Sequence, residues 1–85
     1  MQESKKRKKL DMSRNDEFRY MLGELVKDLD ESVRGAIYGG IYSKFAKIDL
    51  NSAKEFIIRK KSEGILSEEL SKKLIDLLYR YGKYY

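Results

Sequence analysis

Cysteine, histidine, tryptophan, proline and threonine are all missing from the 85 residues of this chain. Without cysteine there is no disulfide, no thiolate nucleophile and no thiolate metal site. Without histidine there is neither the commonest general base nor the commonest ligand of transition metals. The acidic group Asp28, Asp30 and Glu31 lacks the glycine and the distal glutamate of a calcium-binding loop. We therefore expect no catalytic residue, no metal site and no cofactor.

Long apolar runs are missing as well. The longest segment without a charge, Gly35 to Ser43, is far too short to cross a bilayer. No apolar region follows the N-terminal bases, so we expect no secretory signal, no membrane partner and a soluble cytoplasmic protein. Glutamine and asparagine are scarce, whereas lysine, glutamate, isoleucine and tyrosine are abundant. This balance is typical of hyperthermophiles and favours a thermophilic archaeal source, with small-sample bias as the alternative.

The net charge of +5 is unevenly distributed along the chain. Residues 1–14 hold six bases and two acids, and residues 15–31 hold two bases and six acids. Residues 32–64 hold seven bases and three acids, and residues 65–85 hold four bases and three acids. The predicted folded part is therefore nearly neutral, and residues 1–14 carry most of the excess positive charge.

Residues 1–14 contain an uninterrupted basic run and too few apolar side chains to order themselves. We expect a disordered basic tail here and a single helical domain over residues 15–85. Five cations in a row can neutralise phosphates of DNA or RNA and release counterions. The run could instead serve solubility, or lie on the acidic residues that follow it. The proposed phosphate-contacting residues of this run are Lys5, Lys6, Arg7, Lys8 and Lys9.

Apolar spacing predicts helices over about 16–29, 32–47, 50–63 (or 53–63) and 68–81. Ser13 or Asn15 would cap the first helix, Asp49 or Ser52 the third and Ser67 the fourth. Gly64 would end the third helix, and the short link after it predicts an antiparallel hairpin with the fourth. No segment alternates with period two, so we expect no strand. The predicted fold is a compact all-α bundle of three to four helices.

The second predicted helix has an apolar stripe on one side and small residues on the other. Its predicted core stripe consists of Val33, Ile37, Ile41, Phe45 and Ile48. The opposite side carries Gly35 and Gly39, and glycine in a helix costs about 1 kcal/mol relative to alanine. Close approach of another backbone, within the fold or from a partner, would explain them. Alternatively, the pair Gly39–Gly40 breaks the helix in two.

A second group of bases, Lys54, Arg59, Lys60 and Lys61, lies on the third predicted helix. Together with the helix before it, the third predicted helix could form a helix-turn-helix motif, in which it would enter the major groove of DNA. The four bases spread around the helix, however, and no side chains suited to reading base edges accompany them. A solvated helix surface with phosphate contacts at Arg59, Lys60 and Lys61 is the favoured interpretation.

Aromatic and basic residues alternate at the C-terminus, from Tyr79 to Tyr85. Such residues stack on single-stranded bases or anchor protein interfaces. Tyr81 falls on the core face of the last helix, whereas Tyr79 projects away from it, and Tyr84 and Tyr85 follow Gly82, where the helix should stop. We predict partner contacts for Tyr79, Tyr84 and Tyr85; packing against the first helix is the alternative.

Together these features predict a non-catalytic accessory subunit of a nucleic-acid-handling complex, with Gly35 and Gly39 also contacting the larger partner. In size, basic charge, helical content and composition, the chain resembles the small accessory subunits of the B-family replicative DNA polymerase of archaea. The resemblance is one of overall character and assigns no residue. It implies DNA replication as the process and a polymerase as the partner protein. A ribosome-associated protein, a free-standing DNA-binding protein and a protein-only adaptor remain alternatives.

Overall fold

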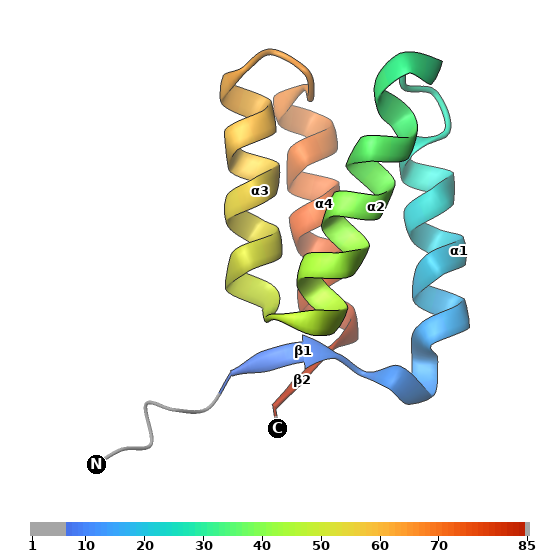
Figure 1. Ribbon diagram of the computed structural model, residues 1–85, viewed down its shortest axis with the longest axis vertical. Helices are drawn as coiled ribbons and strands as arrows, with labels where there is room; N and C mark the ends of the chain where they lie inside the picture. Colours follow the sequence, from blue (N-terminus) through green and yellow to red (C-terminus); the bar gives the residue numbers. More distant parts are fainter. Residues whose placement is uncertain (1–6, 85) are drawn as a thin grey trace.

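Four helices run alternately up and down, and a small two-stranded sheet lies across one end of the bundle (Figure 1). The computed structural model describes residues 7–84. The helices are α1 (Asn15–Val26), α2 (Glu31–Lys47), α3 (Leu50–Ser62) and α4 (Glu68–Tyr81). The strands are β1 (Lys8–Leu10) and β2 (Gly82–Tyr84), and a short 3-10 turn, Met12–Arg14, connects β1 to α1. The predicted all-α bundle is confirmed.

Short polar side chains start three of the helices. The carboxylate of Asp30 accepts a hydrogen bond from Ser32 N (3.1 Å) before α2. The carboxylate of Asp49 accepts a hydrogen bond from Ser52 N (2.8 Å) before α3. The hydroxyl of Ser67 accepts a hydrogen bond from Leu70 N (3.0 Å) before α4. Each bond satisfies a backbone donor that has no partner within its helix. The predicted Ser67 cap is thus confirmed, and Asp49 rather than Ser52 caps α3.

The start of α1 differs from the prediction that Ser13 or Asn15 caps it. Arg14 occupies the cap position, and its side chain makes no capping bond. Ser13 instead bonds to Asp11, whose carboxylate accepts from both its backbone N (3.1 Å) and its Oγ (2.7 Å). Asn15 accepts a hydrogen bond from the Tyr42 hydroxyl (2.6 Å), which ties α1 to α2. A local hydrogen bond to Asp11 has therefore taken Ser13, and a tertiary one from Tyr42 has taken Asn15.

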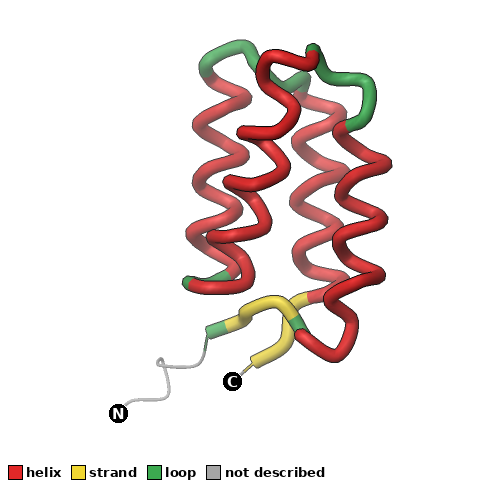
Figure 2. The backbone as a smooth tube through the Cα atoms, turned by 45° about the vertical axis from the view of Figure 1, so that its right-hand side comes forward, coloured by secondary structure: helices red, strands yellow, loops and turns green. Residues whose placement is uncertain are grey.

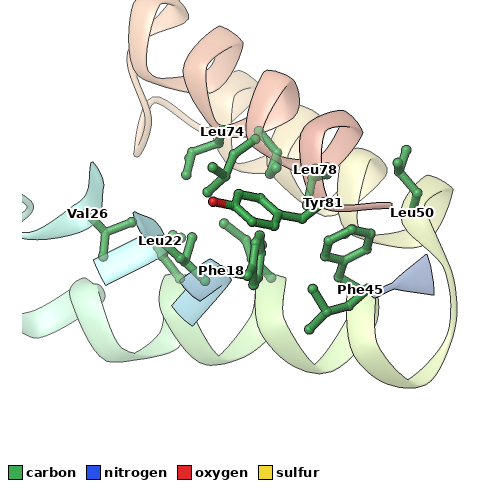
Figure 3. Close-up of a cluster of buried hydrophobic side chains, with 14 of the residues drawn as sticks. Phe18, Leu22, Val26, Phe45, Leu50, Leu74, Leu78 and Tyr81 are labelled. Carbon is green, nitrogen blue, oxygen red and sulfur yellow. The ribbon is translucent and has the colours of Figure 1, made fainter. Parts of the chain in front are cut away.

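The core is filled by apolar side chains from all four helices (Figure 3). At its centre the Phe18 ring meets Phe45 and Tyr81 edge-on, with centroid distances of 5.1 and 5.7 Å. Tyr81 is buried, as its position on the α4 stripe predicts. Ile48 was expected in the core but is 46% exposed, because α2 ends at Lys47 and the chain turns there.

Residues 8–14 do not form the predicted loose tail, and the expectation of a chain without strands is wrong. β1 pairs antiparallel with β2, with Lys8 opposite Tyr84 and Leu10 opposite Gly82 (Figure 2). Leu10 is buried in the core, and the backbone N–H of Asp11 donates to the carbonyl of Tyr81 (2.9 Å). The burial of Leu10 and the pairing of β1 with β2 order residues 8–14, although their composition does not predict an ordered segment. Residues 1–6 and 85 lie outside the described part.

A glycine permits this junction of sheet and bundle. A Cβ at Gly82 would lie 3.0 Å from the carbonyl oxygen of Leu78 and 3.1 Å from Leu50 Cδ1. The chain therefore leaves α4 and enters β2 at a point where neighbouring atoms leave no room for a side chain. Gly64, with φ of +83°, makes the turn after α3 that the sequence predicts.

Candidate functional site

Basic and aromatic side chains from four elements converge at the sheet end of the α3–α4 hairpin. Lys8 comes from β1, Lys54 from α3, Tyr79 from α4 and Tyr84 from β2. We call these four residues the basic–aromatic patch. Tyr79 is 46% exposed and Tyr84 is 60% exposed, so both residues remain open to a ligand.

The two lysines are held against the two rings. The ammonium of Lys8 lies 5.5 Å from the ring centroid of Tyr79 and 5.1 Å from that of Tyr84. The ammonium of Lys54 lies 5.4 Å from the Tyr79 centroid and donates a hydrogen bond to the Tyr79 hydroxyl (3.2 Å). These are distances at which a cation is attracted to an aromatic face. One ammonium group is thus shared by both rings.

The local structure dictates this arrangement. Lys8 and Tyr84 are register partners in the sheet, so their side chains leave it on the same side. In the antiparallel hairpin, Lys54 near the start of α3 lies beside Tyr79 near the end of α4. The sheet crosses this same end of the bundle, which brings the two pairs together (Figure 1).

The other bases of the strand region have different surroundings. Arg7 forms an ion pair with Asp49 (3.4 Å), the residue that caps α3. Lys9 and Lys83 are register partners that line a groove of about 410 Å³ between the sheet, the 3-10 turn and α2. The pKa of Asp11 in this groove is lowered by its hydrogen bonds from Ser13 and by the nearby charge of Lys83. The predicted basic run is therefore divided between two sides of the sheet, and Lys5 and Lys6 lie outside the described residues.

The second predicted group of bases does not join the first. Arg59, Lys60 and Lys61 lie near the end of α3, at the opposite end of the bundle from the sheet (Figure 1). Lys60 bonds to Glu63 (3.2 Å) and lies over the Phe56 ring at 5.4 Å. Lys54, which had been grouped with these residues only as a neighbour in sequence, belongs to the basic–aromatic patch instead.

The glycines of α2 divide into two kinds. Gly35 and Gly39 are exposed, and within residues 7–84 a Cβ at either would meet no atom closer than 4 Å beyond its chain neighbours and the backbone of its own helix. Close packing inside the fold therefore does not explain them. Gly40 packs against the Phe56 ring, and the helix continues through it, so the alternative of a break at Gly39–Gly40 is wrong. Gly35 lines a groove of about 390 Å³ between α1 and α2, with Tyr38 on one wall.

A polar cluster beside the core links the start of α1 to the end of α4. Glu17 accepts hydrogen bonds from Arg14 (3.1 Å) and from the Tyr81 hydroxyl (2.7 Å), and these bonds lower its pKa. The pKa of Tyr81 is raised, first by the bond to Glu17 and then by burial. Because the Arg14 guanidinium also lies over the Tyr81 ring at 4.3 Å, we interpret this cluster as structural.

Over residues 7–84, no three acidic side chains gather closely enough to hold a metal ion together. Within the same range, no helix has the length and apolar character needed to span a membrane.

The sequence patterns indicate Tyr79, Tyr84, Lys8 and Lys54 separately, the last as part of the second basic group, but do not bring them together. One signal was present: in the predicted hairpin, Lys54 and Tyr79 are about equally distant in sequence from the turn, so they fall opposite each other. The strand pairing that adds Lys8 and Tyr84 has no such signal. Tyr85, also predicted to contact a partner, lies outside the described residues.

No protein-family model matches this chain, and neither a curated protein nor a solved structure matches it.

Proposed function

We propose that this protein is a non-catalytic nucleic-acid-binding subunit that contacts its ligand through the basic–aromatic patch. The observation that carries the proposal is the convergence of two exposed tyrosine rings and two ammonium groups from β1, α3, α4 and β2. Lysine is the side chain that neutralises backbone phosphates, and exposed aromatic rings are the surfaces on which bases stack.

Stability alone does not account for the patch. A cation–π contact at an exposed site contributes only about 0.5–1 kcal/mol. The α3–α4 hairpin and the sheet are already anchored by buried residues, among them Leu10, Leu50 and Leu78. Polar side chains at Tyr79 and Tyr84 would cost the fold only these small contributions. A ligand with both negative charge and flat apolar faces explains the combination better.

The exposed glycines of α2 support an accessory rather than a free-standing role. Gly35 and Gly39 each weaken the helix by about 1 kcal/mol relative to alanine, and no neighbour in the fold requires them. A helix of a larger partner could approach this face closely. In this proposal the patch contacts nucleic acid while α2 docks on the partner protein. The resemblance noted above makes a replicative DNA polymerase the first partner to test.

A charge-matched comparison tests the nucleic-acid contact. Fluorescence anisotropy with a labelled oligonucleotide would compare the wild type with Lys8→Gln/Lys54→Gln and with Lys27→Gln/Lys73→Gln. The control lysines are exposed and paired with Glu24 and Glu69, away from the patch. We expect the patch variant to bind at least about tenfold more weakly and to lose roughly 0.7 per lysine from the salt slope on a single strand. Equal losses in both variants would contradict the proposal.

A pull-down from the native lysate tests the accessory role. We expect one large protein to remain bound after nuclease treatment and to be lost from Gly35→Leu/Gly39→Leu, whose side chains would block close approach on α2. If every bound protein leaves with the nucleic acid, the chain acts as a free-standing binder. Recovery of ribosomal proteins would favour the ribosome-associated alternative.

A further inference from the structure

We infer that the basic–aromatic patch binds unpaired bases, so that its ligand is single-stranded nucleic acid rather than a duplex. The inference rests on the proposed function and specifies its ligand. The two tyrosine rings carry the inference, because an aromatic ring contributes to binding according to the area of a base that it can cover.

The rings are placed to serve neighbouring nucleotides. Both centroids lie within 5.5 Å of the same nitrogen, Lys8 Nζ, so the two ring centres are at most about 11 Å apart. Successive nucleotides of one stacked strand are separated by about 3.4 Å, so bases of one short segment can reach both rings. In a duplex the base faces are covered by their neighbours in the stack. Only an unpaired or splayed base offers a free face to Tyr79 or Tyr84.

The surroundings of the patch do not fit duplex reading. Reading the major groove needs a helix or a two-stranded ribbon that enters the groove and carries side chains suited to base edges. The ribbon here has three residues in each strand and lies against the helix ends, and α3 packs against both α2 and α4. The side chains that the patch presents are lysines and tyrosines. They can hold a backbone and stack bases.

Lys8 occupies the place that a base would take. Its ammonium is shared between the rings of Tyr79 and Tyr84. A base stacking on either ring displaces it, and the released ammonium stays beside the base on its flexible stem, within reach of a phosphate. Lys54 remains bonded to the Tyr79 hydroxyl and keeps that ring oriented. Binding of a nucleotide thus exchanges the Lys8 ammonium on a ring for a base.

Helix geometry indicates the direction in which a longer strand would run. Lys61 follows Lys54 by seven residues, which places it on nearly the same face of α3 and about 10 Å farther along the axis. Lys72 precedes Tyr79 by the same interval on the antiparallel α4. Glu68 and Asp76 lie on this face of α4 or beside it and limit the favourable path. A strand would therefore run from the sheet along α3 toward Lys61.

The test compares the affinities for single-stranded and duplex DNA of the wild type and of variants that lack one tyrosine ring. Anisotropy would be measured with labelled oligo(dT) and with a duplex of equal length, for the wild type, Tyr79→Leu, Tyr84→Leu and the control Tyr20→Leu. Tyr20 is 67% exposed on α1 and lies outside the patch. We expect each patch variant to lose roughly 5- to 150-fold in affinity for oligo(dT), the range of one stacked base. The duplex affinity of all variants, and the behaviour of Tyr20→Leu, should stay at the wild-type level.

The outcomes separate the inference from the proposed function. Equal binding of duplex and oligo(dT), with no effect of either ring, overturns the single-strand inference and leaves phosphate binding intact. Failure to bind any nucleic acid overturns both. Polyglutamate is the competitor that tests an acidic protein as the ligand. If it displaces oligo(dT) at equal charge and the ring variants do not alter this competition, the patch is a site for acidic polypeptides and the inference is wrong.

Discussion

The three glycines of α2 provide a prediction in which the same substitution has opposite effects on one helix. Gly35→Ala and Gly39→Ala each add a Cβ that, in the described part of the chain, meets no atom within 4 Å apart from its chain neighbours and its own helix backbone. Alanine improves helix propensity over glycine, so each variant should gain about 0.5–1 kcal/mol in the free energy of unfolding. For a domain of this size such a gain raises Tm by roughly 2–8 °C.

Gly40→Ala should behave differently because the Phe56 ring already occupies the space. The added Cβ would lie 2.4 Å from Cζ of this ring and 2.9 Å from its Cε2. The ring must therefore move, although it packs against the core and interacts with the ammonium groups of Lys44 (5.3 Å) and Lys60 (5.4 Å). Overpacking of this kind costs about 1–3 kcal/mol, which exceeds the propensity gain or cancels it. Gly40→Ala should thus be less stable than Gly39→Ala by about 1–3 kcal/mol.

Urea unfolding followed by circular dichroism measures these differences, and a double variant identifies their cause. Phe56→Leu shortens the clashing side chain, so Gly40→Ala should be tolerated better in that background than in the wild type. If Gly40→Ala is as stable as Gly39→Ala, or if Phe56→Leu leaves its cost unchanged, the packing argument is wrong. A loss of stability in Gly35→Ala or Gly39→Ala would refute the statement that the fold does not need those glycines.

Three further predictions concern groups outside α2. The bonds from Arg14 and Tyr81 lower the pKa of Glu17, so its contribution is present at neutral pH and disappears as pH falls below the ordinary value of 4.5. Glu17→Gln should therefore be less stable than the wild type at pH 7 and equally stable in acid, as urea titrations at both pH values would show. Leu10→Ala should cost about 2–5 kcal/mol in the same assay, because Leu10 is a core residue; a surface-like loss below about 0.5 kcal/mol would contradict the ordered β1 strand. Ser71→Ala should raise Tm, since the buried Ser71 hydroxyl has no hydrogen-bond partner among residues 7–84; a lower Tm would show that the hydroxyl is satisfied.

Much of the bundle was predictable because its helices have strong local signals. Ser67, Asp49 and Gly64 mark helix ends through hydrogen-bonding and backbone properties that act over three or four residues. The stripe ending in Tyr81 identified the core face of α4. Some predictions failed because the deciding interaction was distant in sequence. Asn15, expected as a cap, bonds to Tyr42 on α2 instead.

The ends of the chain show the same limit more clearly. Residues 8–14 resemble a solvated tail in composition, yet Leu10 is buried and the backbone pairs with Gly82–Tyr84. A three-residue strand in each partner is too short for alternation to appear in the sequence. The basic–aromatic patch depends on this pairing, because it brings Lys8 beside Tyr79 and Tyr84. The residue types of the candidate site were therefore predictable, and their convergence required the tertiary structure.

The measurement that tests the central claim most directly is a titration of the isotope-labelled protein with oligo(dT), followed by backbone amide chemical shifts in NMR spectra. We predict that the largest changes occur at Lys8, Lys54, Tyr79 and Tyr84, with smaller ones along α3 toward Lys61. Changes confined to α1 and α2, or none at a concentration of oligo(dT) that saturates binding in anisotropy, would contradict the assignment of the patch as the nucleic-acid site.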